Sequence, residues 1–159
     1  MNYTIGIDLG GTNTRIGLVA EDGKVIEVLK FKTYEHKELN DFVETLSDNI
    51  VLIVQKHNLP KESIKVGIGA PNGNYYAGTI EQAPNLPFKG IVPLVDLLKE
   101  SLKKKSYSAE VVLTNDANAA AMGEKIYGKA KNVRDFVMIT LGTGVGSGIF
   151  VDNKLVYGK

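Results

Sequence analysis

The sequence contains no cysteine, and its only two histidines, His36 and His57, are far apart. Without cysteine the chain forms neither disulfides nor thiolate metal sites, and two isolated histidines do not predict a zinc site. The absence of cysteine also fits a cytoplasmic protein. Lysine and arginine number 19 against 18 aspartates and glutamates, and the formal net charge is +1. Such a balance gives no field that would attract nucleic acid or an anionic membrane surface.

Long apolar runs are also missing, because none approaches the roughly 20 residues that span a bilayer. The N-terminus leads directly into a strand pattern that contains Asp8, which is unlike a signal peptide. The 159 residues, 43% of them hydrophobic, suffice for one ordinary core, or for one domain and part of a second. We therefore expect a globular protein with no membrane segment and no nucleic-acid partner.

The apolar patterns along the chain predict an α/β fold. Residues 40–57 place Phe42, Leu46 and Ile50 at helical spacing, which indicates a helix with one face toward the core. The turn-rich segment from residue 71 to about 90 reads as a long connection. The expected order is βββαβαβα. Strands are expected from residue 4, over 14–20, over 24–32, over 64–71 and over 109–114. Helices are expected over 40–57, over 92–105 and from about 115.

Residues 136–157 repeat the pattern of the opening segment. Gly10-Gly11-Thr12 corresponds to Gly142-Thr143-Gly144, and each copy reads as strand, glycine-threonine turn, strand, tight turn, strand. Such a repeat predicts a duplicated domain whose second copy has only begun. We expect a first domain over residues 1–130 and an incomplete second one over 131–159.

The two glycine-threonine turns are candidate phosphate sites. A glycine turn between strands exposes consecutive backbone N–H groups without a Cβ in the way, and such a concavity binds anions. Either turn alone is as well explained as a simple hairpin turn. Two matched turns, each with a threonine hydroxyl, favour the interpretation that both grip one polyphosphate across a cleft.

Three motifs carry a family resemblance: "DLGGTNTR" at 8–15, "NDANAAAMGE" at 115–124 and "TLGTGVGSG" at 140–148. With "GIGAPN" at 67–72 and "APNLP" at 83–87, they resemble the ROK family of repressors, open reading frames and sugar kinases, and within it the bacterial glucokinases. The resemblance covers essentially the whole chain. It implies the two-lobed, ribonuclease-H-like ATPase fold that is shared with actin and hexokinase. In this chain we then expect a mixed sheet, followed by the opening hairpin of a second, similar domain.

The resemblance also implies a reaction, in which a sugar hydroxyl attacks the γ-phosphate of ATP. Asp116 then acts as the general base, and Asn115 beside it holds a sugar hydroxyl. Asp116 opens a predicted helix, whose dipole favours an ionised carboxylate able to accept a proton. A weak base suffices when the transition state is loose and positioning carries much of the catalysis. The residues alone leave open that Asn115 or Asp116 only caps the helix.

The remaining site residues follow from the resemblance. Asp8 is expected to bind magnesium, through water. The sugar-facing loop departs from the commoner proline-glycine version at "PNGNYYAG", which weakens the assignment of Asn72. The residues expected at the phosphates are Gly10, Gly11, Thr12, Asn13, Arg15, Gly142, Thr143 and Gly144, and those expected at the sugar are Ala70, Pro71, Asn72, Asn85, Asn115 and Asp116.

Other functions are compatible with parts of this pattern. A sugar-responsive repressor of the same family would carry a helix-turn-helix before its first strand, which here begins at Thr4. An actin-type assembly module would keep the phosphate turns without needing Asn115, Asp116 or Asn85. The motifs do not distinguish glucose from other hexoses or N-acetylhexosamines. We further expect that this chain is part of a homo-oligomeric kinase, and that it is inactive without the sugar contacts and second lobe of a longer protein.

Overall fold

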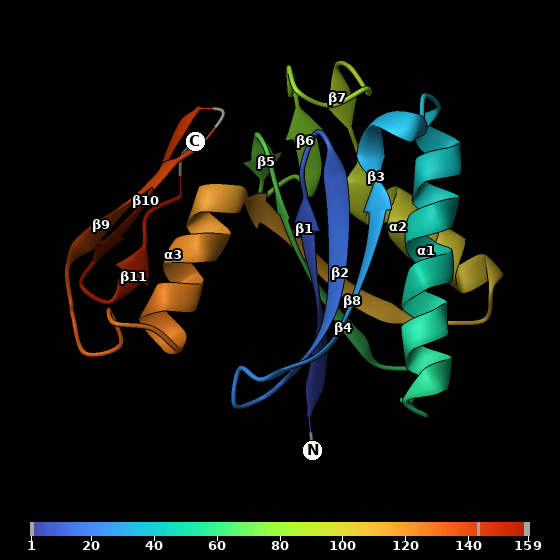
Figure 1. The fold of residues 1–159 in the computed structure, drawn as a ribbon, viewed down its shortest axis with the longest axis horizontal. Helices are drawn as coiled ribbons and strands as arrows, with labels where there is room; N and C mark the ends of the chain where they lie inside the picture. Colours follow the sequence, from blue (N-terminus) through green and yellow to red (C-terminus); the bar gives the residue numbers. More distant parts are fainter. Residues whose placement is uncertain (1, 143, 158–159) are drawn as a thin grey trace.

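A five-stranded mixed sheet forms the centre of the computed structural model, which describes residues 2–142 and 144–157. Its strand order is β3-β2-β1-β4-β8, as Figure 1 shows. The first three strands are antiparallel neighbours, whereas β4 runs parallel to both β1 and β8. The strands are β1 (Tyr3–Leu9), β2 (Asn13–Ala20), β3 (Val25–Lys32), β4 (Ile64–Ala70) and β8 (Ala109–Asn115).

One face of this sheet is covered by α1 (Leu39–Lys56) and α2 (Leu94–Lys104). Strand residues alternate between the two faces, so that Ile5, Ile7 and Leu9 of β1 all enter the core. On α1 the apolar positions predicted from their spacing are buried, among them Phe42 and Leu46. Among the described residues no helix combines the length and apolar character needed to cross a membrane. The predicted order βββαβαβα is confirmed for these elements.

The segment from residue 71 to 90, expected as a long connection, is more regular than predicted. It contributes β5 (Gly73–Asn74) and β6 (Thr79–Glu81), which pair with β7 (Ile91–Val92) in a small antiparallel sheet. Strands of two or three residues are too short to show an alternating pattern, and the sequence therefore indicated only turns. A short 3-10 helix, Thr33–Glu35, connects β3 to α1.

The last part of the chain forms a second sheet with the order β11-β10-β9. Its strands are β9 (Phe136–Leu141), β10 (Val145–Val151) and β11 (Lys154–Leu155), which confirms the predicted repeat of three antiparallel strands. On the inner face of this sheet, the rings of Phe136 and Phe150 stack at 4.8 Å between centroids. The outer face carries exposed apolar side chains, namely Val137, Ile139, Leu141, Val145 and Ile149. Within the described residues this sheet therefore buries only one face.

Helix α3 (Asp116–Ile126) lies between the two sheets (Figure 1). A methyl group added at Gly69 of β4 would lie 3.1 Å from Ala119 Cβ, and one added at Gly148 of β10 would lie 2.4 Å from Ala121 Cβ. These distances leave no room for larger side chains on either side of the helix. Alanine on α3 and glycine on the strands thus bring the helix close to both sheets.

This close packing predicts opposite effects for two Gly→Ala substitutions. Gly148→Ala should destabilise the chain by ~1–3 kcal/mol, because its methyl group overlaps Ala121. Gly123→Ala, in α3 with open space around its Cβ position, should stabilise it by ~0.5–1 kcal/mol, because glycine is a poor helix former. Urea unfolding of both variants measures the difference. Equal effects would show that α3 and β10 are not in close contact.

Candidate functional site

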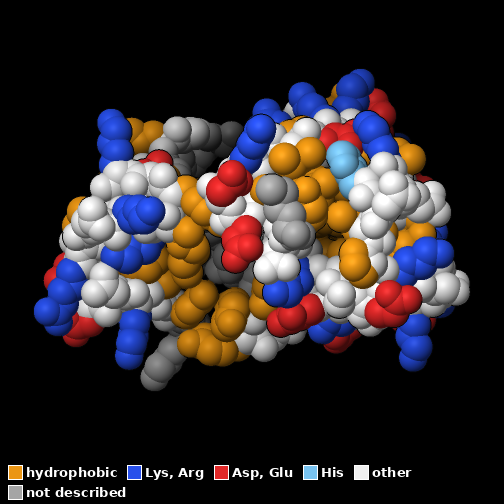
Figure 2. All heavy atoms as spheres, turned by 90° about the horizontal axis from the view of Figure 1, so that it is seen from below, with side chains coloured by type: hydrophobic (Ala, Val, Ile, Leu, Met, Phe, Trp, Pro, Cys, Tyr) orange, Lys and Arg blue, Asp and Glu red, His pale blue; other side chains and the backbone are white. Residues whose placement is uncertain are grey.

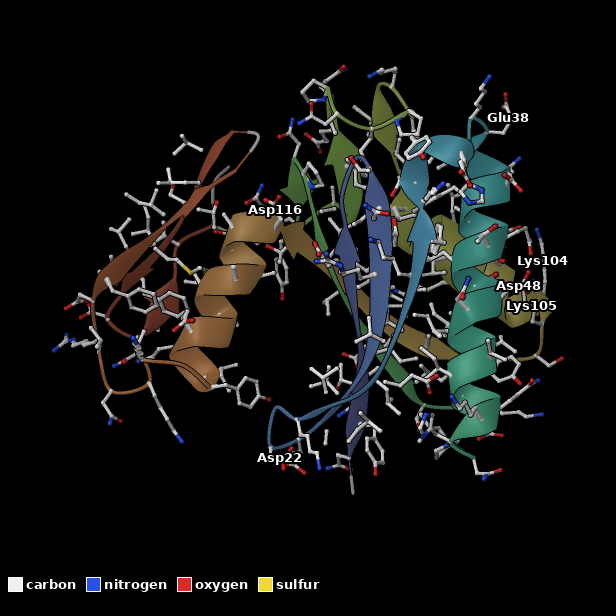
Figure 3. All side chains as sticks on the ribbon, in the orientation of Figure 1. Asp22, Glu38, Asp48, Lys104, Lys105 and Asp116 are labelled. Carbon is white, nitrogen blue, oxygen red and sulfur yellow. The ribbon has the colours of Figure 1, made fainter. Side chains whose placement is uncertain are left out.

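The N-terminus of α3 presents the two polar side chains expected at a reaction centre. Asn115 is the N-cap residue, and its Oδ1 accepts a hydrogen bond from the backbone N–H of Ala117 at 3.0 Å. Asp116 Oδ1 accepts from the same N–H at 2.8 Å, and this side chain is exposed. Figure 3 shows Asp116 at the end of α3 that lies beside the central sheet. Asn115 thus caps the helix, as the alternative left open by the residues alone had it, and the exposed Asp116 carboxylate stands where the helix dipole favours negative charge.

One cavity, of about 750 Å³, lies between α3 and the face of the central sheet that α1 and α2 leave open. We call it the sheet cavity. Glycines at positions 6, 17, 67 and 69 form part of its lining and leave the backbone accessible. Figure 2 shows hydrophobic side chains gathered along the hollow between the central sheet and the part formed by α3 and the second sheet. The polar groups of the lining are Asp8, Arg15, Thr114, Asp116 and Asn118.

Three of these polar side chains come from one row across the sheet. Asp8 pairs with Arg15 of β2 and with Gly69 of β4, and Gly69 pairs with Thr114 of β8. Neighbouring residues in such a row point to the same face of a sheet. The Asp8 carboxylate lies 3.6 Å from the Arg15 guanidinium, and both side chains are more than half exposed. The row therefore presents one positive and one negative charge to the sheet cavity.

A second cavity, of about 640 Å³, is lined mainly by side-chain amides and tyrosines, and we call it the amide cavity. Asn118, Tyr75 and Tyr157 line both cavities, which therefore meet beside the first turn of α3. The polar residues that line the amide cavity are Asn72, Asn74, Glu81, Asn115, Asn118 and Ser147, together with Tyr75, Tyr76 and Tyr157. The arrangement offers both donors and acceptors to a polar ligand.

The turn between β1 and β2 is held by backbone contacts. The N–H of Gly10 donates to Asn13 O at 3.0 Å, and the N–H of Thr33 donates to Thr12 O at 3.0 Å. A methyl group at Gly11 would lie 2.3 Å from the carbonyl oxygen of Asn85. Glycine is thus required at position 11, because the loop before β7 passes directly against the turn.

The matching turn between β9 and β10 is more open. The N–H of Gly142 donates to Gly144 O at 3.0 Å, and both glycines are exposed with open space around them. Thr143 lies outside the described residues. Figure 1 shows that β1 and β9 both end at the side of the molecule where α3 begins. The two turns therefore lie at the same end of the molecule as Asp116.

The residues predicted to face the sugar do not all lie in one cavity. Ala70 is fully buried and pairs with Asn115, and Pro71 follows it half-buried. Asn72 lines the amide cavity with φ of 52°, and its Nδ2 donates to the carbonyl oxygens of Glu81 and Gln82 at 3.0 and 3.2 Å. Asn85 is exposed beside the β1–β2 turn, and it is not among the described residues that line the two cavities.

Several residues of the two cavities escaped the sequence interpretation. Asn118 follows Asn115 by three positions, a spacing that puts both on one helix face and could have identified it. Tyr75 and Tyr157 carry no such signal, because they meet only in the folded chain. Thr114 Oγ1 is buried beside the sheet cavity and has no hydrogen-bond partner among the described residues.

Comparison with known proteins gives the family, since the model of the ROK family matches residues 4–159. The chain belongs to the ROK family. It is 35% identical to a glucokinase of Thermotoga maritima over 98% of its length. A solved ROK family glucokinase from Streptomyces griseus, in complex with glucose and AMPPNP, is 33% identical over 99% of the chain, with a TM-score of 0.75. The fold is therefore the actin- and hexokinase-like fold of ROK sugar kinases.

The family also contains transcriptional regulators, and the chain is 37% identical to a xylose repressor of Caldicellulosiruptor bescii over 97% of its length. The chain spans about half the length of the curated glucokinases it matches, 46% for the Thermotoga protein. It covers 47% of the solved Streptomyces glucokinase. Family membership thus gives the fold, and the repressor shows that relatives with this fold have two kinds of function.

The contact between Gly11 and Asn85 predicts that the first turn is far more sensitive to substitution than the second. Gly11→Ala should destabilise the chain by ~1–3 kcal/mol, because its methyl group collides with a backbone carbonyl. Gly142→Ala, where nothing lies within 4 Å of the added methyl, should change stability by less than ~0.5 kcal/mol. Thermal unfolding compares the two variants. Equal loss in both would contradict the packing of the 82–90 loop against the β1–β2 turn.

Proposed function

We propose that this chain carries the catalytic carboxylate and the phosphate-binding turns of an ATP-dependent hexose kinase, with glucose as the first candidate substrate. The observation that carries the proposal is the exposed Asp116 at the N-terminus of α3, beside the point where the amide cavity and the sheet cavity meet. One cavity offers amide and hydroxyl groups suited to a sugar. The other lies along the sheet face that holds Asp8 and Arg15.

In the proposed reaction, a hydroxyl of the sugar attacks the γ-phosphate of ATP and Asp116 accepts the hydroxyl proton. The phosphoryl-transfer transition state is loose, so that positioning contributes more than the strength of the base. Asn115 Oδ1 is already engaged by the N–H of Ala117. Its amide nitrogen therefore remains to donate a hydrogen bond to a sugar hydroxyl.

The phosphates of ATP are proposed to lie between the two glycine-threonine turns, with the guanidinium of Arg15 near them. Backbone N–H groups of such turns and a nearby arginine stabilise phosphate oxygens. The residues proposed for this role are Gly10, Gly11, Thr12, Asn13, Arg15, Gly142, Thr143 and Gly144.

Magnesium is proposed to accompany the nucleotide at Asp8. The Asp8 carboxylate offers oxygen ligands, which suit magnesium, although the guanidinium of Arg15 lies 3.6 Å from it, and the described residues contain no cluster of three potential metal ligands. An exposed single carboxylate fits an ion that is otherwise held by water and substrate phosphates. When bound, magnesium would neutralise phosphate charge.

A sugar-responsive regulator is the second candidate, because the similarity to the xylose repressor is as high as that to the glucokinases. Such a protein needs the amide cavity to bind a sugar, but it has no need for a proton acceptor beside it. Sugar binding without phosphoryl transfer would favour this candidate.

Asp116→Asn tests the kinase proposal. The asparagine keeps the Oδ1 acceptor for the N–H of Ala117, so the melting temperature should stay near that of the unmodified protein. Turnover of glucose and ATP should fall by ~10²–10⁴-fold, because the proton acceptor is lost. A coupled assay on the longest natural polypeptide that contains this chain measures kcat.

The matched control is Asp96→Asn, which changes an exposed aspartate in the first turn of α2, far from both cavities. This variant should retain full turnover. Undiminished kcat in Asp116→Asn would remove Asp116 from the catalytic role and leave it only as a capping residue.

A further inference from the structure

Three tyrosines that no sequence motif predicted meet at the edge of the amide cavity. Tyr75 and Tyr76 lie in the turn between β5 and β6, whereas Tyr157 follows β11 in the second sheet. The rings of Tyr75 and Tyr157 stack with 4.5 Å between centroids and 22° between planes. The ring of Tyr76 stands edge-on to both, at 5.5 and 5.8 Å. We call this group the tyrosine cluster.

The cluster is built on a well-ordered turn. Asn74 Oδ1 accepts hydrogen bonds from the backbone N–H groups of Tyr76 and Ala77 at 3.0 and 3.2 Å. Asn74 Nδ2 donates to Glu81 Oε1 at 3.0 Å, and Thr79 Oγ1 donates to the same oxygen at 2.8 Å. These bonds hold the turn in one shape, so the tyrosines stay in place without being buried beneath other side chains.

The rings nevertheless remain accessible to a ligand. Tyr76 is 75% exposed and Tyr75 is 41% exposed, although exposed aromatic side chains usually find cover in a protein. All three tyrosines line the amide cavity, as do Asn115 and Asn118. Burial raises the pKa of the Tyr157 hydroxyl, with Tyr75 and Tyr76 adding to the effect, so this hydroxyl remains a neutral donor near pH 7.

A cavity lined by both an aromatic surface and a group of amides matches the chemistry of a pyranose. The C–H bonds of a sugar ring form apolar patches above and below it, while its hydroxyls extend around the edge. Ligand sites commonly combine aromatic walls with a few polar groups that set orientation. The tyrosine cluster supplies such a wall, and Asn115 and Asn118 supply polar groups in the same cavity.

We propose that the tyrosine cluster is the aromatic wall of the sugar site, against which one C–H face of a hexopyranose packs while its hydroxyls reach the amides at the start of α3. The wall thereby sets the orientation of the sugar and favours hexoses without an axial hydroxyl on the packed face. This inference rests on the proposed function, because it places the acceptor sugar in the amide cavity. The β5–β6 turn and the segment after β11 form the wall, so it is complete only when the small β5-β6-β7 sheet and the second sheet are held together.

Saturation-transfer difference NMR with D-glucose tests the wall directly, in the longest natural polypeptide that contains this chain. Saturation of the protein's aromatic protons should pass to the sugar C–H protons of one ring face, either H1, H3 and H5 or H2 and H4. Tyr76→Ser should weaken this transfer and raise the KM for glucose by roughly three- to tenfold, with the KM for ATP unchanged. Tyr75→Ser should do the same.

Two further variants serve as controls. Tyr76→Phe keeps the aromatic ring, so the saturation transfer and the KM for glucose should stay near those of the unmodified protein. Tyr34→Ser removes a tyrosine whose exposure, 51%, lies between those of Tyr75 and Tyr76, in the 3-10 helix before α1, and it should change neither the transfer nor the KM. Because Tyr76 is so exposed, its replacement leaves the fold intact, and circular dichroism checks this.

The outcomes separate the inference from the proposed function. Phosphorylation of glucose with unchanged transfer and KM in both serine variants would overturn the aromatic wall and leave the kinase proposal standing. Transfer lost in Tyr76→Phe as well as in Tyr76→Ser would also overturn it, because the hydroxyl rather than the ring would then matter. An unmodified protein that binds no hexose would contradict both proposals.

Discussion

The close packing of α3 between the two sheets is the constraint on which the candidate site depends. Ala119 meets Gly69 on one side of the helix and Ala121 meets Gly148 on the other, and a further methyl group would be tight at Gly69 and would overlap Ala121 at Gly148. Protein interiors of this density do not deform continuously. The position of the helix therefore fixes where Asn115 and Asp116 stand relative to both sheets, and with them the point where the two cavities meet.

This arrangement explains why the site draws on residues far apart in the sequence. The central sheet supplies Asp8 and Arg15, the second sheet supplies Ser147 and Tyr157, and α3 lies between them with Asp116 at its first turn (Figures 1 and 3).

The charged residues at the end of α2 have a different role, because they connect α2 to α1. Lys105 pairs with Glu44 and Asp48 of α1 at 2.6 and 2.7 Å, on the far side of the sheet, where it lowers the pKa of the Glu44 carboxyl.

The elements that could be predicted from the sequence are those that show as a regular spacing of apolar residues or as a local motif. The spacing of Phe42, Leu46 and Ile50 predicted α1, the repeat predicted the second sheet, and the alanine-rich segment from about residue 115 predicted α3. The sequence could not predict β5, β6 and β7, which are too short for a pattern, or the tyrosine cluster, whose members meet only after folding. The alanines of α3 indicated a helix, but its contact with glycines on two sheets is a property of tertiary packing.

The central claim is that one nucleotide is gripped from both sheets while Asp116 lies between them. The most direct measurement is amide NMR of the chain titrated with AMPPNP and magnesium in the presence of glucose. The account predicts chemical-shift changes in both glycine-threonine turns, at residues 10–13 and 142–144, together with Asn115 and Asp116. Changes confined to one turn, or distributed without reference to either turn, would contradict it.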